Sequence, residues 1–108
     1  MSYLQTVNHA SHDLPVLTIT KDTINAFKAH WPCSGIPEEV DLVVCVFNIA
    51  GGKRDLIDYE VSRADDSVID PDTMPDAGRA LSALMDIELA LYLGATTKEL
   101  AQLYAGGN

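Results

Sequence analysis

The residues best suited to bind a metal ion are the three histidines of this chain and one of its two cysteines. They form the pairs His9-x2-His12 and His30-x2-Cys33, and two such pairs separated by a longer segment resemble the spacing of structural zinc sites. Two observations argue against a zinc site. The ligand pairs of such sites usually begin with cysteine, and His30 has the position of a helix-ending residue whose partial positive charge suits the helix dipole. We therefore predict no metal or other cofactor, and keep these four residues as the metal candidates.

The second feature is acidic. Between positions 55 and 76 stand eight acidic residues and a single basic one, Arg63. Such runs usually form a solvated strand face and loop, but they also serve as docking surfaces for basic proteins, because complementary charge raises association rates. A calcium loop is not predicted, because the EF-hand spacing and its central glycine are missing. The predicted interaction residues are Asp58, Glu60, Asp65, Asp66, Asp70, Asp72 and, from the long helix described next, Glu88.

The stretch from Thr73 to Gly94 carries the longest helical pattern, and we predict a helix over about 74–93 around which the chain packs. Thr73 and Asp76 have the spacing of a capping box, and Gly94 suits the helix end. Glu88 falls inside an unusually wide apolar arc, where an unpaired carboxylate would be costly. Four explanations of Glu88 are open. Its carboxylate pairs with Arg63, Lys28 or His30, it reaches solvent, it faces a cleft, or it lies at the boundary between the core and a second contact surface.

The remaining elements complete an α+β domain of order β-α-β-β-α-α. A strand is predicted over 14–19, a helix over 20–31, a β-hairpin over about 42–63 packed on the long helix, and a short C-terminal helix over about 97–105. In the helix over 20–31, the spacing of Ile24, Phe27 and Trp31 predicts one buried stripe. In the second hairpin strand, alternation predicts Ile57, Tyr59 and Val61 on one face, and Thr96 and Glu99 have the spacing of a capping box for the last helix. Residues 64–72 are predicted to be an acidic loop, and residues 1–13 a loose segment or a short edge strand. The length of 108 residues predicts a single domain over 1–108.

Composition restricts the partners. The net charge is −9, which repels polyphosphate and argues against direct binding to nucleic acid. There is no secretory pattern after Met1 and no apolar run long enough to cross a membrane, so we expect a soluble cytoplasmic protein with no membrane partner. Cys45 lies in an apolar run and Cys33 in a loop, and both are expected to be reduced.

Other patterns of chemistry are incomplete. The turn between Leu89 and Leu100 resembles a helix-turn-helix, but its second helix has one lysine, Lys98, beside an acidic residue. Two antiparallel helices joined through a glycine give the same pattern by packing alone. The AGGK segment lacks the spacing of a phosphate loop, and no nucleophile, base and orienting group can be assigned. The sequence therefore predicts no enzyme.

The best interpretation is a small acidic protein-interaction module that docks on a basic protein surface, such as that of a nucleic-acid-binding protein. Inhibitors and immunity proteins of phages and mobile elements are of this type. A homodimer through the long helix is a further prediction, because its apolar arc is wider than one small core needs. The alternatives are a ligand- or zinc-binding domain, using His9, His12, His30 and Cys33 or a cleft near Glu88, and a helix-turn-helix DNA-binding protein, which the net charge disfavours.

Overall fold

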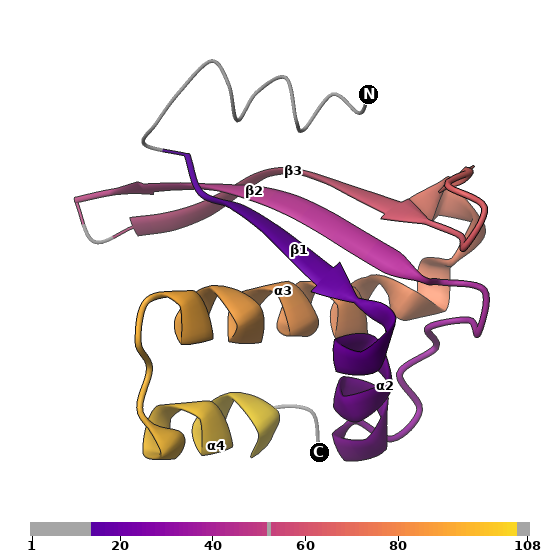
Figure 1. Ribbon diagram of the computed structural model, residues 1–108. Coiled ribbons are helices and arrows are strands. Elements are labelled where there is room, and N and C mark those ends of the chain that lie inside the picture. The colour runs from indigo at the N-terminus through magenta and orange to yellow at the C-terminus, as the bar shows by residue number, and fades with distance from the viewer. Residues whose placement is uncertain (1–13, 52, 106–108) are drawn as a thin grey trace.

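The computed structural model describes residues 14–51 and 53–105, and Figure 1 shows the path of the chain. The elements are β1 (Val16–Thr20), α2 (Lys21–His30), β2 (Leu42–Ala50), β3 (Lys53–Ser62), β4 (Val68–Ile69), the 3-10 turns η1 (Pro71–Thr73) and η2 (Pro75–Ala77), α3 (Gly78–Tyr92) and α4 (Thr97–Ala105). The α+β class, the predicted order and the hairpin over about 42–63 are confirmed. The strand β4 lies inside the segment predicted to be a loop.

The four strands form one antiparallel sheet in the order β1-β2-β3-β4. β1 pairs with β2 along its whole length, from Val16 opposite Val46 to Thr20 opposite Leu42. β4 pairs with β3 only at the end of the strand, so within the described chain most of β3 is a sheet edge. In the hairpin turn Gly51 has a φ of 58°, which a glycine adopts without strain.

A β-bulge changes which residues of β3 face the helices. Val46 lies opposite Asp58 and Phe47 opposite Leu56, which leaves Ile57 without a partner on β2. Simple alternation predicted Ile57 on the core face, and this prediction is wrong, because Ile57 is 46% exposed. An extra residue of this kind disrupts the ladder locally and bends the strand.

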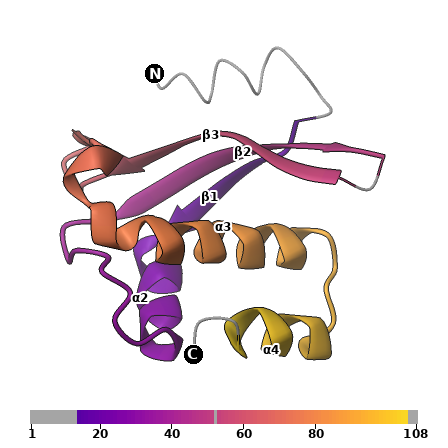
Figure 2. The same ribbon diagram turned by 180° about the vertical axis from the view of Figure 1, so that it is seen from behind.

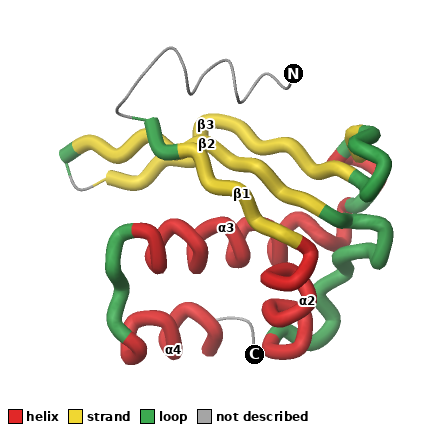
Figure 3. Tube along the Cα trace, in the orientation of Figure 1, coloured by secondary structure: helices red, strands yellow, loops and turns green. Residues whose placement is uncertain are grey.

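The helices of the described chain all lie on one face of the sheet (Figures 1 and 3). Views from opposite sides show α3 next to the sheet and α4 on the far side of α3 (Figure 2). The wide apolar arc of α3 is therefore covered from two directions within the chain. Its buried residues are Ala80, Leu81, Leu84, Met85, Ile87, Leu89 and Ala90.

This layering accounts for most of the wide apolar arc of α3 by contacts within the chain. The surplus of apolar residues is used internally, between the sheet and the outer helices. The homodimer through α3 stays a prediction. Leu91, 49% exposed, and Tyr92, 61% exposed, remain open at the end of the helix.

Helix α3 starts later than predicted. Met74 has φ −130° and ψ 57°, because the residue before a proline is disfavoured in the helical region. The chain therefore makes two 3-10 turns, and α3 begins only at Gly78. The Thr73 hydroxyl donates to the Asp70 carbonyl oxygen at 2.6 Å instead of capping the helix, so the predicted capping box is wrong.

The end of α3 is as predicted. Gly94 has a φ of 83°, and its N–H donates to the Leu91 carbonyl at 3.0 Å. The N–H of Ala95 donates to the Ala90 carbonyl at 2.8 Å. This pair of bonds is the Schellman pattern, which satisfies carbonyl groups that the last turn leaves without partners.

The outer helices complete the core. Ile24, Phe27 and Trp31 of the α2 region are buried, as their spacing predicted, and the Phe27 and Trp31 rings stack with centroids 5.2 Å apart. Tyr104 of α4 contacts Phe27 and His30 with ring centroids at 6.4 Å and 5.4 Å.

The predicted capping box of α4 is confirmed. The Glu99 N–H donates to the Thr96 hydroxyl at 3.2 Å, and the Thr96 N–H donates to the Glu99 carboxylate at 3.4 Å. Across the described segments, no helix combines the length and apolar character needed to cross a membrane.

Candidate functional site

Six of the seven predicted interaction residues come from one stretch of the chain, which runs from β3 through the β3–β4 turn to η1. Asp58 and Glu60 pair with Val46 and Val44 of β2, so their side chains lie on the sheet face away from the helices, where both are half-buried. The other four side chains are exposed. We call this group the acidic edge: Asp58, Glu60, Asp65, Asp66, Asp70 and Asp72.

Two of these carboxylates shape the chain locally. The Asp65 carboxylate accepts from the Ser67 N–H at 3.0 Å and from its hydroxyl at 2.6 Å. These bonds lower the pKa of Asp65. The Asp70 carboxylate accepts from the Asp72 N–H at 3.0 Å, and Asp66 has a φ of 69°. Asp is favoured in such turns because its short side chain bonds to nearby backbone groups and it tolerates a positive φ. Part of the acidic sequence is thus explained by turn formation.

Arg63, the basic residue within this segment, makes contacts both inside the segment and with Glu39 outside it. Its guanidinium binds the Glu39 carboxylate at 2.7 Å and donates to the Ser67 hydroxyl at 3.2 Å and the Val68 carbonyl at 3.4 Å. It therefore holds the turn together and has Glu39 as its charge partner. The segment keeps its acidic character.

Exposed apolar side chains lie along the same strands. Leu56 and Ile57 of β3 are 39% and 46% exposed, and Val68 of β4 is 58% exposed. Val68 pairs with Ser62, five residues along β3 from Ile57, so the exposed apolar side chains form two separate sites. Scattered apolar residues are normal on a protein surface, but each of these sites adjoins carboxylates along the chain, and apolar surface bordered by charge is characteristic of an interaction site. Charged residues on a sheet edge also prevent unwanted strand pairing, which is the structural explanation of the same charges.

Glu88 lies in a different part of the molecule, half-buried in α3. Burial raises the pKa of Glu88. Burial also raises the pKa values of Cys45, to about 12, and of Tyr104. The negative charge of Glu88 is a second, smaller cause of both of these shifts. Two of the predicted partners bind other carboxylates: Lys28 binds Glu38 at 2.9 Å, and Arg63 binds Glu39. Glu88 is therefore a carboxylate at the margin of the core, separate from the acidic edge.

The metal candidates are only partly described. His9 and His12 lie outside the described residues. His30 and Cys33 are both exposed, and Cys33 has a φ of 58°. Within 14–51 and 53–105, no three His, Cys, Asp or Glu side chains come together as a metal site. Cys45 is buried as predicted, and burial keeps its thiol protonated.

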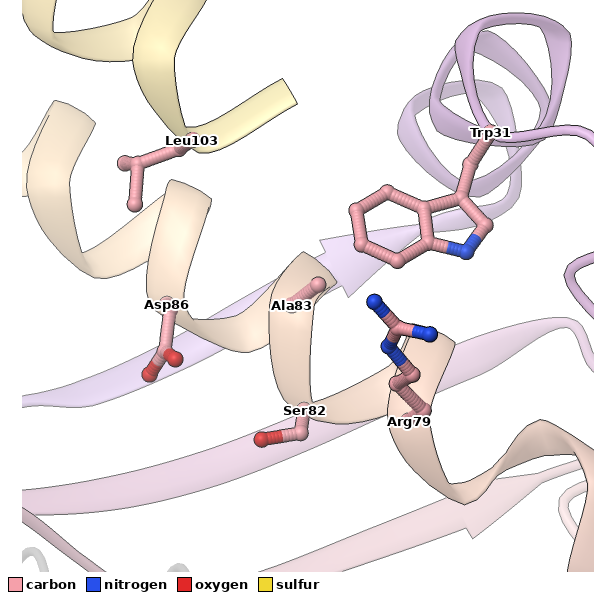
Figure 4. A pocket seen from close by; sticks show the side chains of 6 residues that line it. All are labelled: Trp31, Arg79, Ser82, Ala83, Asp86 and Leu103. Atoms are coloured by element: carbon pink, nitrogen blue, oxygen red, sulfur yellow. The ribbon is translucent and has the colours of Figure 1, made fainter. Parts of the chain in front are cut away.

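A groove that the sequence analysis did not predict lies between α2, α3 and α4 (Figure 4). Its volume is about 330 Å³. The alternative of a ligand-binding domain placed a cleft near Glu88, and Glu88 is not among the residues that line this groove. The lining residues are Trp31, Arg79, Ser82, Ala83, Asp86 and Leu103.

The α3–α4 pair does not have the geometry of a DNA-reading motif. The two helices run side by side in opposite directions in both views (Figures 1 and 2). The helices of a helix-turn-helix cross at roughly 90–120°. The glycine turn between them is therefore explained by packing, as the sequence analysis allowed.

Comparison with protein-family models, curated proteins and solved structures finds no match for this chain. The interpretation of function therefore rests on the residues and their geometry.

Proposed function

We propose that this protein is a non-enzymatic interaction module that binds a basic protein surface through the acidic edge. The observation that supports the proposal is that exposed Ile57 adjoins Asp58 on β3, and that exposed Val68 of β4 lies between Asp66 and Asp70 along the chain. Charge alone would be compatible with a solvated loop. Apolar contact area next to like charges gives a partner both burial energy and electrostatic attraction.

The partner that fits best is a protein with lysine and arginine residues around an apolar patch, including a nucleic-acid-binding protein occupied at its basic surface. An inhibitor or immunity-type role in the cytoplasm is the form of this proposal that the chain's small size and acidity favour. A stable complex of this kind buries roughly 1,200 Å² or more in total. In such a complex, the acidic edge and the exposed residues Leu56, Ile57 and Val68 would form the centre of the interface and part of its rim.

The test is affinity capture of binding proteins from the native host, followed by mass spectrometry and elution with increasing salt. Ile57→Ser should weaken capture, because it removes an apolar side chain from the proposed contact. Leu91→Ser is the matched control, because Leu91 is 49% exposed, close to the 46% of Ile57, but lies on α3.

The proposal predicts a basic protein that is lost with Ile57→Ser, retained with Leu91→Ser and released by salt, since screening weakens exposed charge pairs. Equal capture by the two variants would contradict it. So would partners that remain bound regardless of ionic strength.

A further inference from the structure

Helix α4 is attached to the rest of the protein by one short stripe of side chains. None of its residues is buried, and only Leu100 and Tyr104, four residues apart, are half-buried against the core. The Tyr104 ring contacts Phe27 and His30 of α2, with ring centroids at 6.4 Å and 5.4 Å. α4 therefore covers part of α2 and α3 without being enclosed itself.

Two hollows remain where α4 meets the protein. One is the groove described above, and the second, of about 280 Å³, is lined by Arg54, Ala90, Glu99, Gln102 and Leu103. Leu103 lines both hollows and is still 37% exposed. Apolar side chains beside a hollow gain less from packing than those of a close-packed core. We therefore expect α4 to open at a lower free energy than α3.

The connection between α3 and α4, residues 93–96, has the features of a hinge. It reverses the chain through Gly94, whose φ of 83° is a left-handed conformation, and a β-carbon there would have open space around it. Short connections of this kind permit two copies of a protein to exchange the element that follows, because the reversal can open into an extended segment.

Three large apolar side chains precede the hinge and are exposed. They are Leu91, Tyr92 and Leu93, which are 49%, 61% and 42% exposed. Because successive helical residues point about 100° apart, they surround the end of α3. Figures 1 and 2 show this end beside the connection to α4. A second copy joined through an extended connection would lie against these side chains, and burying them would favour the joined form.

We propose that two copies of this chain form a dimer by exchanging α4, so that each α4 packs on α2 and α3 of the other copy. The contacts that α4 makes within one chain are then made between copies, so the complementarity of the interface is already present. The additional stabilisation comes from Leu91, Tyr92 and Leu93 around the two hinges. This dimer uses none of the residues of the acidic edge and does not depend on the function proposed above.

The oligomeric state is measured by sedimentation equilibrium of the full-length protein, at about 10 μM to 1 mM and physiological ionic strength. The net charge of −9 opposes association, but a Debye length of about 8 Å confines the repulsion to charges near the contact. Samples are first equilibrated just below the unfolding midpoint, so that α4 can open. The proposal predicts a reversible rise from monomer to dimer mass.

Two glycine variants test the hinge. Gly94→Ala should strain the closed connection, because alanine resists a positive φ, and leave an extended connection unstrained. Since each dimer has two hinges, its dissociation constant should fall at least about tenfold. Gly51→Ala is the matched control, because Gly51 has a φ of 58° and open space around a β-carbon, but lies in the β2–β3 turn. It should leave the dissociation constant unchanged.

Two apolar variants test the contact around the hinge. Tyr92→Ser should raise the dissociation constant at least about tenfold, because each dimer loses two apolar side chains from the contact. Ile57→Ser, at a residue 46% exposed on β3, should leave it unchanged. The same pair separates the two proposals, because only Ile57→Ser should weaken capture of a basic host protein. Circular dichroism verifies that each variant is folded.

Amide hydrogen exchange of the monomer tests the opening that the exchange of α4 requires. The amides of α4 should exchange at a lower free energy than those of α3. The proposal is overturned if the amides of both helices exchange only through global unfolding, or if the wild type stays monomeric up to about 1 mM. Equal dissociation constants for Gly94→Ala and Gly51→Ala, or for Tyr92→Ser and Ile57→Ser, would also contradict it.

Discussion

Helix α3 and the acidic edge are stabilised in opposite ways. α3 has its apolar side chains packed between the sheet and the outer helices, with seven residues buried along its length. The acidic edge is shaped by short polar contacts, such as those of Asp65 with Ser67 and of Asp70 with Asp72. We therefore expect changes in α3 to act on folding, and changes of charge on the acidic edge to act on the proposed binding.

The largest effect should come from the packed side of α3. Leu84 is 1% exposed, so Leu84→Ala should destabilise the protein by about 2–5 kcal/mol, through lost burial and the cavity left behind. Leu91→Ala makes the same chemical change on the same helix at a residue that is 49% exposed, and should stay within about 0.5 kcal/mol of the wild type. Chemical denaturation followed by circular dichroism measures both. Similar losses would mean that α3 is not packed on two sides.

The next effect lies where the segment after α2 meets the start of the α3 region. Gly35 has a φ of 74°, and a β-carbon there would lie 2.5 Å from the Asp76 carbonyl oxygen. Gly35→Ala should therefore cost roughly 1–3 kcal/mol, the range for a strained backbone residue. Gly78→Ala is the control, because Gly78 has helical dihedrals and open space around the new methyl group. It should raise stability by about 0.4–1 kcal/mol. Thermal and denaturant unfolding would show the two opposite signs, and a shared sign would contradict the backbone geometry.

A smaller effect is expected in α4, the outermost layer. Thr96→Ala removes the hydroxyl that accepts from the Glu99 N–H and should cost about 1 kcal/mol. Thr97→Ala, at the neighbouring exposed residue, provides the comparison. Amide hydrogen exchange should show faster opening of α4 in the first variant. Unchanged exchange would mean that the capping box does not limit the opening of this helix.

The smallest effect is a pH dependence at the margin of the core. The raised pKa of Glu88 means that the folded protein favours its protonated form, so its charge costs stability only above the unfolded pKa. Glu88→Gln should leave stability unchanged near pH 3 and increase it at pH 7. The pKa of Glu38 is lowered by its hydrogen bond to Lys28 and by the lysine's charge. Glu38→Gln should therefore lose stability at pH 7 and none near pH 3. Denaturation midpoints across this range test both signs, and a gain for Glu88→Gln already present at pH 3 would contradict this linkage.

Much of the fold could be predicted from local patterns. The period of Ile24, Phe27 and Trp31 predicted the buried face of α2, and the Thr96–Glu99 spacing predicted the start of α4. Both are decided within a few residues. The predicted start of α3 is wrong because Pro75 keeps Met74 out of the helical region, and this local constraint overrides the capping pattern.

Features that depend on distant contacts were not predicted. The bulge at Ile57 follows from how β2 and β3 meet, and no residue of β3 marks it. The groove needs Trp31, Asp86 and Leu103 from three helices, so its existence depends on how those helices pack. Asp86 and Arg79 could have been noticed as opposite charges two turns apart on one face of the long helix. The apolar walls of the groove, which come from other helices, could not be predicted in this way.

The most direct test of the central claim is a comparison of two variants with the same net charge of −5 instead of −9. One has Asp65, Asp66, Asp70 and Asp72 each changed to Asn, which keeps the turn-forming side chains and removes four charges from the acidic edge. The other has lysine at the exposed helical positions Asn25, Ala29, Ala101 and Ala105. Capture of the partner and the unfolding midpoint are measured on the same preparations. The account predicts that both variants keep a cooperative unfolding transition, and that only the Asn variant loses the partner. Equal capture by the two variants would contradict it.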